Sequence, residues 1–186
     1  MGTKVKTGVV RMNYCHFFHP RASTQNAEEK FSGQFFVPKT DKETVQRIQE
    51  AIKGEIASRW GKKTPPSLKI AFKDGDDPNQ LPDSATPGAE PYEGHYFFNA
   101  TANKDSAPGV VDDNRQPILD PGEINWGDFG RVSASIYSYD NVSKGVSFGL
   151  NNVQWLYKGE PLGSRTRAED DFNDDFKAPE MADFLA

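Results

Sequence analysis

Residues able to stack on bases and to pair with phosphates share one face of a predicted strand at positions 129–139. Arg131, Tyr137 and Tyr139 fall on the same side, because side chains two positions apart point to one face of a strand. Apolar residues occupy the alternate positions 132, 134 and 136. Aromatic faces hold the bases of single-stranded nucleic acid, at about 1–3 kcal/mol per stacked base, and cations hold its phosphates. The pattern therefore predicts a core side and an exposed binding side.

Aromatic residues also gather in the first and last predicted strands. Tyr14 and Phe18 share a face within 4–18, and Trp155 lies near the end of a strand at 145–157. Cations in the predicted loops are placed to attract phosphates. The predicted contacts with single-stranded DNA are Tyr14, Phe18, Arg21, Lys39, Lys104, Arg131, Tyr137, Tyr139 and Trp155. The competing interpretation is that these aromatic rings only cover the core of a small barrel.

Catalytic and metal-binding patterns are present only in fragments. Residues 145–149 match G-x-S-x-G, but a hydrolase needs a strand, a sharp turn and a helix there, with a histidine later in the chain. Here the residues after Gly149 are strand-like, and each histidine precedes Ser147. A zinc site is also excluded, because the cluster Cys15, His16 and His19 lacks the fourth ligand that a structural zinc site needs. We expect no catalytic residue, no cofactor and no metal. The enzymatic alternative is a metal-dependent nuclease or DNA-processing enzyme that uses acids within 74–128.

The net charge of −5 is distributed unevenly along the chain. Residues 1–73 hold 14 Lys and Arg against 6 Asp and Glu, residues 74–128 hold 2 against 12, residues 129–167 hold 5 against 2, and residues 168–186 hold 1 against 7. Residues 1–167 therefore carry +1 and residues 168–186 carry −6. A nucleic-acid partner explains a basic body with an acidic tail, and an acidic tail that only improves solubility is the competing interpretation.

Acidic groups separated by single phenylalanines repeat along the C-terminal segment. Such a peptide suits the docking of aromatic anchors into a partner's pockets, and as a polyanion it competes with DNA for a basic groove. The predicted partner-binding residues are Asp170, Asp171, Phe172, Asp174, Asp175, Phe176, Asp183 and Phe184. We expect residues 168–186 to be a disordered tail. A protein-interaction module that acts through this tail is therefore a third functional alternative.

Strand patterns dominate residues 1–167, which we expect to form a single β-rich domain. The predicted strands cover 4–18, 30–37, 68–73, 95–101, 129–139 and 145–157, with long polar connections at 74–94 and 102–128. One helix is predicted from Asp41 to Arg59, capped by Thr40 with Glu43 completing a capping box, and ended by Gly61. The predicted fold class is mainly β with one long helix, as an OB-fold-like barrel of five or six strands with long loops. A sandwich is the alternative, because an OB-fold does not usually carry its helix after the second strand.

The sequence predicts neither a membrane-spanning nor a secreted protein. No run approaches about 18 apolar residues, and no apolar region follows the first residues, Met1 to Lys4. The one cysteine, Cys15, cannot form a disulfide framework, which fits a reducing cytosol. We therefore expect a cytoplasmic protein.

Several short motifs spread over nearly the whole chain resemble those of phage-encoded single-stranded-DNA-binding proteins. They are Phe17-Phe18-His19-Pro20-Arg21, Glu29-Lys30-Phe31-Ser32, Val37-Pro38-Lys39, residues 94–100, 108–112 and 149–154, and Gly159-Glu160-Pro161-Leu162-Gly163 leading to residues 168–172. The resemblance implies an OB-fold that binds single-stranded DNA without strong sequence preference. It also implies a role in phage DNA replication or recombination, in the cytoplasm of the infected bacterial host, with replication or recombination proteins as partners of the acidic tail. In the bacterial pattern the tail ends on Phe, whereas here Leu185 and Ala186 follow Phe184.

Overall fold

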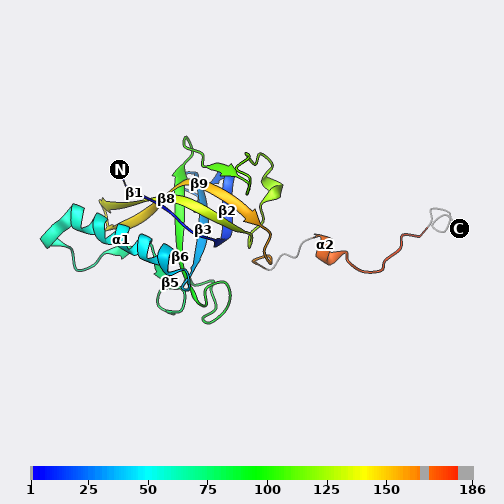
Figure 1. Ribbon diagram of the computed structural model, residues 1–186, viewed down its shortest axis with the longest axis horizontal. Helices are drawn as coiled ribbons and strands as arrows, with labels where there is room; N and C mark the ends of the chain where they lie inside the picture. The colour runs from blue at the N-terminus through cyan, green and yellow to red at the C-terminus, as the bar shows by residue number, and fades with distance from the viewer. Residues whose placement is uncertain (1, 164–167, 180–186) are drawn as a thin grey trace.

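The computed structural model describes residues 2–163 and 168–179. Most of this part forms one strongly curved sheet with a long helix, α1, beside it (Figure 1). The elements are β1 (Thr3–Lys6), β2 (Val10–Arg21), β3 (Lys30–Pro38), α1 (Lys42–Trp60), η1 (Gly61–Lys63), β4 (Lys69–Ile70), β5 (Lys73–Asp74), β6 (His95–Asn103), β7 (Gly109–Val111), η2 (Pro121–Glu123), β8 (Phe129–Asp140), β9 (Lys144–Tyr157) and α2 (Ala168–Asp171). No helix in this described part is long and apolar enough to span a membrane.

Five strands of the sheet close into a ring. β8 pairs with β2, β2 with β3, β3 with β6, β6 with β9, and β9 with β8. The β6–β9 pair is parallel, and the other pairs of the ring are antiparallel. This is the small Greek-key barrel of an OB-fold. The predicted fold class is therefore confirmed, with α1 inserted between the second and third strands of the ring.

Alternate residues of each strand fill the barrel interior. In β8, Val132, Ala134 and Ile136 are buried, while the odd-numbered positions between them stay partly accessible. Phe35 of β3 and Phe98 of β6 meet in the same interior, with ring centroids 5.4 Å apart. The two faces predicted for 129–139 are confirmed, so the odd-numbered side chains of β8 are available on the outer surface.

The strand predicted at 4–18 is two strands. The chain turns at Gly8, whose amide donates to Thr44 Oγ1 of α1 at 2.9 Å, so β1 ends before it and β2 begins after it. β1 pairs with β8 outside the ring. β2 then continues through Pro20 to Arg21, which pairs with Lys30, where the sequence suggested a loop. The strand predicted at 68–73 is likewise split into β4 and β5, and the connection 102–128 contains β7 and η2.

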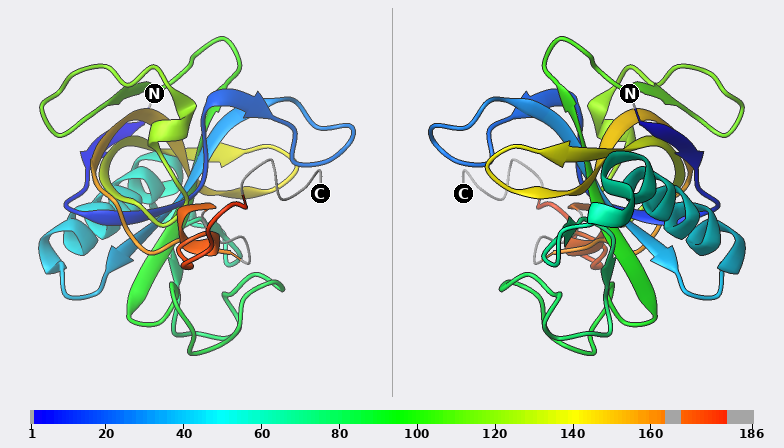
Figure 2. Two further views of the ribbon diagram at one scale, coloured as in Figure 1. Left: turned by 90° about the vertical axis from the view of Figure 1, so that its right-hand side faces the viewer. Right: turned by 90° about the vertical axis from the view of Figure 1, so that its left-hand side faces the viewer.

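Helix α1 starts at a different cap from the one predicted. The Asp41 carboxylate accepts from the Thr44 amide at 3.1 Å and from the Thr44 hydroxyl at 2.6 Å. The predicted Thr40 cap with Glu43 is therefore wrong, since Asp41 already satisfies the amide donor three residues later. Ile48 and Ile52 are buried against the barrel, and α1 packs beside β1 and β8 (Figure 2). Gly61 ends the helix as expected.

The described part of the acidic segment extends away from the barrel (Figure 1). It begins with the short helix α2, and residues 172–179 after it are exposed. Phe172 and Phe176 are 80% and 75% exposed. The predicted Asp183 and Phe184 lie outside the described residues.

Candidate nucleic-acid interface

A strip of small and polar residues crosses the outer surface of the barrel. The strand registers place its members side by side from β2 to β8, as His16, Ser32, Thr101, Gly149 and Ser135. None of these residues is fully buried. We call them the outer strip. Neighbouring strands are about 4.8 Å apart, so its four steps cover about 19 Å along the curved surface.

Aromatic rings stand at the β2 end of the outer strip. The β2–β3 register shifts between Asn13 and His16, and Tyr14 adopts φ 47° there, held by its amide donating to Asn13 Oδ1 at 2.9 Å. Such a bulge re-aims a side chain, and Tyr14 is 41% exposed. Its ring meets Trp126 edge-on at 5.2 Å between centroids, and His16 meets Trp126 at 5.8 Å.

Trp126 is a candidate residue that the sequence did not identify. It is 38% exposed and lies just before β8, in a segment that reads as a polar loop. No strand periodicity marks its orientation. A lone tryptophan in a stretch rich in Asp, Pro and Gly was the available signal.

Cations join the aromatic rings at the same end of the strip. Arg21 pairs with Lys30 across the β2–β3 ladder, and both line a hollow of about 510 Å³ that Tyr14 and His16 also line. The structure thus brings the predicted Tyr14 and Arg21 together. Burial lowers the pKa of His16 and the Arg21 charge lowers it further, so the imidazole is neutral at neutral pH. The loop at 22–29 beside this hollow connects the first two strands of the barrel, a loop with which OB-folds bind oligonucleotides.

Tyr137 and Tyr139 lie toward the other end of the strip. Tyr137 pairs with Ser147, and its Cε1 is 3.9 Å from where a Cβ of Gly149 would be. Tyr139 lies over Gly145 in the same way, with its hydroxyl 2.7 Å from the corresponding position. The two rings therefore cover glycines of β9 on the outer surface, close to the β8–β9 turn. In OB-folds the turn between these two strands also takes part in binding.

Arg131 lies on the same outer face, beside β1. Its Nε donates to the Thr7 carbonyl at 3.1 Å, which holds the side chain at the edge of the barrel. Arg131 is exposed and lines a second hollow with Lys4 and Lys6. The predicted set Arg131, Tyr137 and Tyr139 therefore shares one surface with Tyr14 and Arg21.

A separate hydrophobic cluster closes the outer face of β3 and β6 on one side of the strip. Phe36 and Phe97 point outward, but Tyr92 of the 74–94 connection covers them, with ring centroids 5.1 and 5.0 Å away. Burial raises the pKa of Tyr92, partly offset by its hydrogen bond with Gln34. The connection 74–94 thus forms a wall that limits the accessible face to the outer strip.

Lys39 and Lys104 are placed among acids. Lys39 Nζ lies 2.6 Å from Asp74 Oδ1 and 2.7 Å from Asp76 Oδ2. Desolvation opposes the charge of Lys39, but the two carboxylates outweigh it and raise the lysine's pKa. Lys104 lines a hollow with Glu28, Glu29 and Asp105. We therefore leave both lysines out of the proposed DNA contacts.

Trp155 and Phe18 are partly buried against the main core. The β8–β9 register shifts so that Ser133 pairs with Asn152 and Ala134 with Leu150, which makes Asn151 an extra residue. Beyond it the alternation is reversed, and Trp155 packs against the main core and donates from Nε1 to buried Asp128 at 3.0 Å. Phe18 also packs against this core. Both residues therefore leave the proposed contact set.

Acids of the 74–128 segment hold loops and turns together. Asp112 and Asp120 accept backbone amides of their own turns at 2.8 Å, and Asp128 Oδ2 accepts from the Asn125 amide at 2.9 Å. Within the described residues, no group of His, Cys, Asp and Glu side chains is arranged to hold a metal ion. The G-x-S-x-G match lies wholly inside β9, so the turn and helix of a hydrolase elbow are not formed there.

Known proteins similar to this chain are phage proteins. A family model described as the ssDNA-binding protein of Enterobacter phage Enc34 matches residues 3–185. The putative protein p50 of Acyrthosiphon pisum secondary endosymbiont phage 1 is 29% identical over 187 residues, which cover 98% of this chain and 99% of that protein.

Solved structures share the fold. The single-stranded DNA-binding protein of bacteriophage Enc34 in complex with ssDNA gives a TM-score of 0.71 at 23% identity, over 86% of this chain and 89% of that chain. The single-stranded DNA binding protein gp2.5 encoded by bacteriophage T7 gives 0.63 at 16% identity, over 95% of this chain and 96% of that chain. The fold of most of the chain therefore has counterparts in known structures.

Proposed function

Because the chain belongs to the family of the single-stranded-DNA-binding protein of Enterobacter phage Enc34, we propose that it binds single-stranded DNA along the outer strip of its barrel. The protein protects the single strands that arise in phage DNA replication or recombination, in the cytoplasm of the infected bacterial host. The observation that carries the site is the strand register, which joins Tyr14 and Trp126 at one end of the strip to Tyr137 at the other.

Aromatic and cationic side chains have different roles in the proposed binding. Bases stack on the exposed faces of Tyr14, Trp126, Tyr137 and Tyr139, and phosphates pair with Arg21, Lys30 and Arg131. Between them the strip carries only Ser, Thr and Gly on β3, β6, β9 and β8, so a polynucleotide can approach the sheet closely. Stacking uses the π-face that every base has, which makes the binding largely independent of sequence.

The nuclease alternative is not proposed. The family is one of single-stranded-DNA-binding proteins, and the acids of 74–128 are engaged in turns and ion pairs. Asp74 and Asp76 pair with Lys39, and Asp128 is fully buried. No observation on the described residues favours hydrolysis of DNA over its binding.

We further propose that residues 1–167 are the DNA-binding domain and residues 168–186 a tail for replication or recombination proteins. Exposed Phe172 and Phe176 are free to enter a partner's pockets. The chain leaves the barrel beside the aromatic end of the strip, because the Leu162 amide donates to the Trp126 carbonyl at 3.0 Å. Leu162, six residues before the acidic segment, therefore lies at the aromatic end of the strip.

A titration with oligo-dT at several salt concentrations tests the proposed function. Binding is read from the fluorescence of a labelled oligonucleotide or from quenching of tryptophan. The logarithm of affinity should fall linearly with the logarithm of salt concentration, with a slope of about −0.7 per phosphate contact on a single strand. No binding, or binding that does not change with salt, would contradict the proposal. Incubation of labelled DNA with magnesium or manganese should leave it intact, and cleavage would favour the nuclease.

A further inference from the structure

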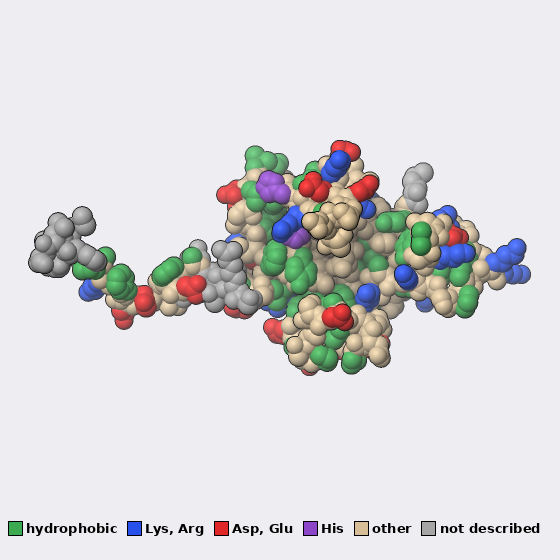
Figure 3. Space-filling view, turned by 180° about the vertical axis from the view of Figure 1, so that it is seen from behind, with side chains coloured by type: hydrophobic (Ala, Val, Ile, Leu, Met, Phe, Trp, Pro, Cys, Tyr) green, Lys and Arg blue, Asp and Glu red, His purple; other side chains and the backbone are tan. Residues whose placement is uncertain are grey.

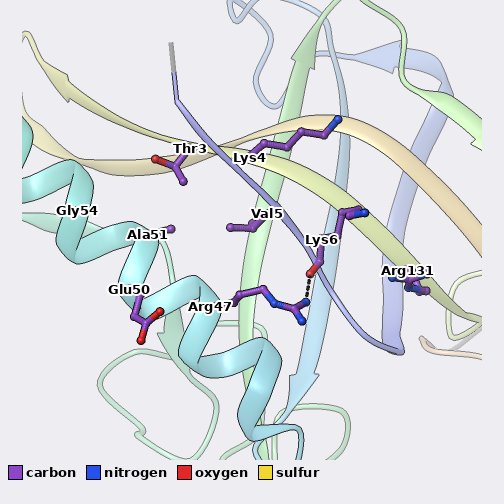
Figure 4. Close-up of a pocket in the computed structure, with 9 residues that line it drawn as sticks. All are labelled: Thr3, Lys4, Val5, Lys6, Arg47, Glu50, Ala51, Gly54 and Arg131. Carbon is purple, nitrogen blue, oxygen red and sulfur yellow. Dashed lines mark hydrogen bonds between the residues drawn. The ribbon is translucent and has the colours of Figure 1, made fainter.

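A cationic hollow of about 600 Å³ lies between β1 and α1 (Figure 4). All the residues of β1 line it, together with Arg131 of β8 and one face of α1. Lys4, Lys6, Arg47 and Arg131 are among the residues that line this β1–α1 hollow, with the Lys4 and Lys6 side chains on the side of β1 that faces away from α1 (Figure 4), and Glu50 is the acid in the lining. The hollow is therefore suited to an anion.

The hollow exists because an edge strand faces a helix across open space. β1 pairs with β8 on one side and with no other described strand. On the free side, Arg47 Nη1 donates to the Lys6 carbonyl at 2.9 Å, and Arg47 Nη2 also pairs with Glu43. Within the hollow, a Cβ at Gly54 would meet nothing within 4 Å. Cations rather than a further strand thus border this edge.

The hollow is continuous with the outer strip. Val5 points inward and is buried, so its neighbours Lys4 and Lys6 project on the outer face. Lys4 pairs with Ser135, the last residue of the strip, and Lys6 pairs with Ser133. A polyanion that crosses the strip from His16 therefore meets Lys4 and Lys6 as it leaves the barrel.

We propose that the β1–α1 hollow binds the phosphate backbone of the same DNA strand after that strand has crossed the ring. The inference rests on the proposed function and extends the DNA site to a strand, β1, that lies outside the ring. The strip alone covers about 19 Å, so a short oligonucleotide is held by the ring and only a longer one reaches the hollow. Binding should therefore depend on Lys4 and Lys6 only above a certain length.

The test compares oligo-dT of about 6 nucleotides, near the lower end of the roughly 4–16 that one OB-fold occupies, with oligo-dT of about 30, which is well beyond it. In the full chain, the double variant Lys4→Gln/Lys6→Gln should bind the long oligonucleotide about 2- to 30-fold more weakly, and the short one like the wild type. Its salt slope on the long oligonucleotide should be shallower by about 1.4, for two lost phosphate contacts. The matched control is Lys62→Gln/Lys63→Gln, which removes the same charge from exposed positions of η1.

Lys and Arg side chains gather at the end of the molecule where α1 and the β8–β9 hairpin lie, so general electrostatic attraction must be separated from binding in the hollow (Figure 3). The control should change affinity for both lengths by the same factor. Equal losses on both lengths for Lys4→Gln/Lys6→Gln, or no loss, would overturn the inference, whereas wild-type protein that binds neither length would overturn the proposed function itself.

Glu50→Gln should increase affinity, whereas a misfolded variant would lose it. The Glu50 side chain accepts a hydrogen bond from Gln46 on the helix surface, and Gln keeps that acceptor while removing one negative charge beside the hollow, since the Glu50 carboxylate points away from β1 (Figure 4). The variant should bind the long oligonucleotide more tightly than the wild type and leave the short one unchanged. Unchanged affinity for the long oligonucleotide would count against phosphates in the hollow.

Discussion

Gly149 lies within the outer strip, so enlarging it tests whether DNA crosses the barrel there. A Cβ at this position would lie 3.6 Å from the Ser135 carbonyl oxygen and 3.9 Å from Tyr137 Cε1, which are ordinary contacts. Gly149 is also not one of the glycines with a positive φ, so its backbone conformation does not require glycine. Because glycine inside a strand costs roughly 0.5–1 kcal/mol relative to alanine, Gly149→Ala should raise the free energy of unfolding by up to about that amount.

Gly149→Leu should then separate binding from stability. The leucine side chain keeps the charge of the strip but stands where a polynucleotide must pass between Thr101 and Ser135. If the strand lifts off and loses one stacked base, binding weakens by about 1–3 kcal/mol, which is about 5- to 150-fold in Kd. Urea unfolding followed by intrinsic fluorescence measures the stability, and anisotropy of a labelled oligo-dT measures the Kd.

Alanine at Gly145, on the same strand, should have the opposite effect on stability from alanine at Gly149. A Cβ there would be 2.2 Å from the Lys69 carbonyl oxygen and 2.7 Å from the Tyr139 hydroxyl, so the backbone of β4 would have to move. Gly145→Ala should therefore lower the free energy of unfolding by about 1–3 kcal/mol.

A folded Gly149→Leu protein that binds oligo-dT with the wild-type Kd would refute the path across β9.

Other predictions concern the tail, the aromatic end of the strip and pH. Deletion of residues 168–186 should tighten oligo-dT binding, since it removes a net charge of −6; the same Kd with and without the tail would exclude it as a competitor. Trp126→Ala should raise the Kd about 5- to 150-fold by removing a stacking surface, whereas Tyr157→Ala, which removes a ring stacked on Phe129, should not. Burial and Arg21 lower the pKa of His16, so its protonated form, which adds a cation beside the phosphates, is gained as pH falls below about 6.5. Affinity measured across this range should rise at low pH in the wild type, and a His16→Gln variant that shows the same rise would rule out this origin.

The outward face of β8 was predictable because one rule determines it. Alternation of side chains across a strand places Arg131, Tyr137 and Tyr139 together, and β8 keeps that alternation throughout the predicted stretch. Trp155 shows where the rule fails. The extra residue Asn151 in β9 reverses the alternation, and the sequence does not reveal which residue of a strand is the extra one.

The aromatic end of the strip could not be predicted, because it depends on contacts between distant segments. Tyr14 is turned outward by a bulge in β2, and Trp126 reaches it from a loop that is over 100 residues later in the chain. The strip itself is defined by the pairing of strands, including the parallel β6–β9 pair, and periodicity within a strand carries no information on its partner. The predicted cap of α1 was wrong for a related reason. The Thr44 hydroxyl donates to Asp41 and accepts from the amide of Gly8, which belongs to another segment.

The distribution of ion pairs explains how a chain with a net charge of −5 can present a cationic path. Acids of the 74–128 segment are used where DNA is not expected: Asp74 and Asp76 hold Lys39 at the far end of β3, and Asp128 is buried. Arg21 and Lys30 flank one end of the strip, and Lys4, Lys6 and Arg131 flank the other. Exposed charges farther apart than about 8–10 Å are largely screened at physiological salt. The phosphates therefore respond to the cations beside the strip, and the acids that lie close to those cations are Glu28 and Glu50 rather than the acids of the 74–128 segment.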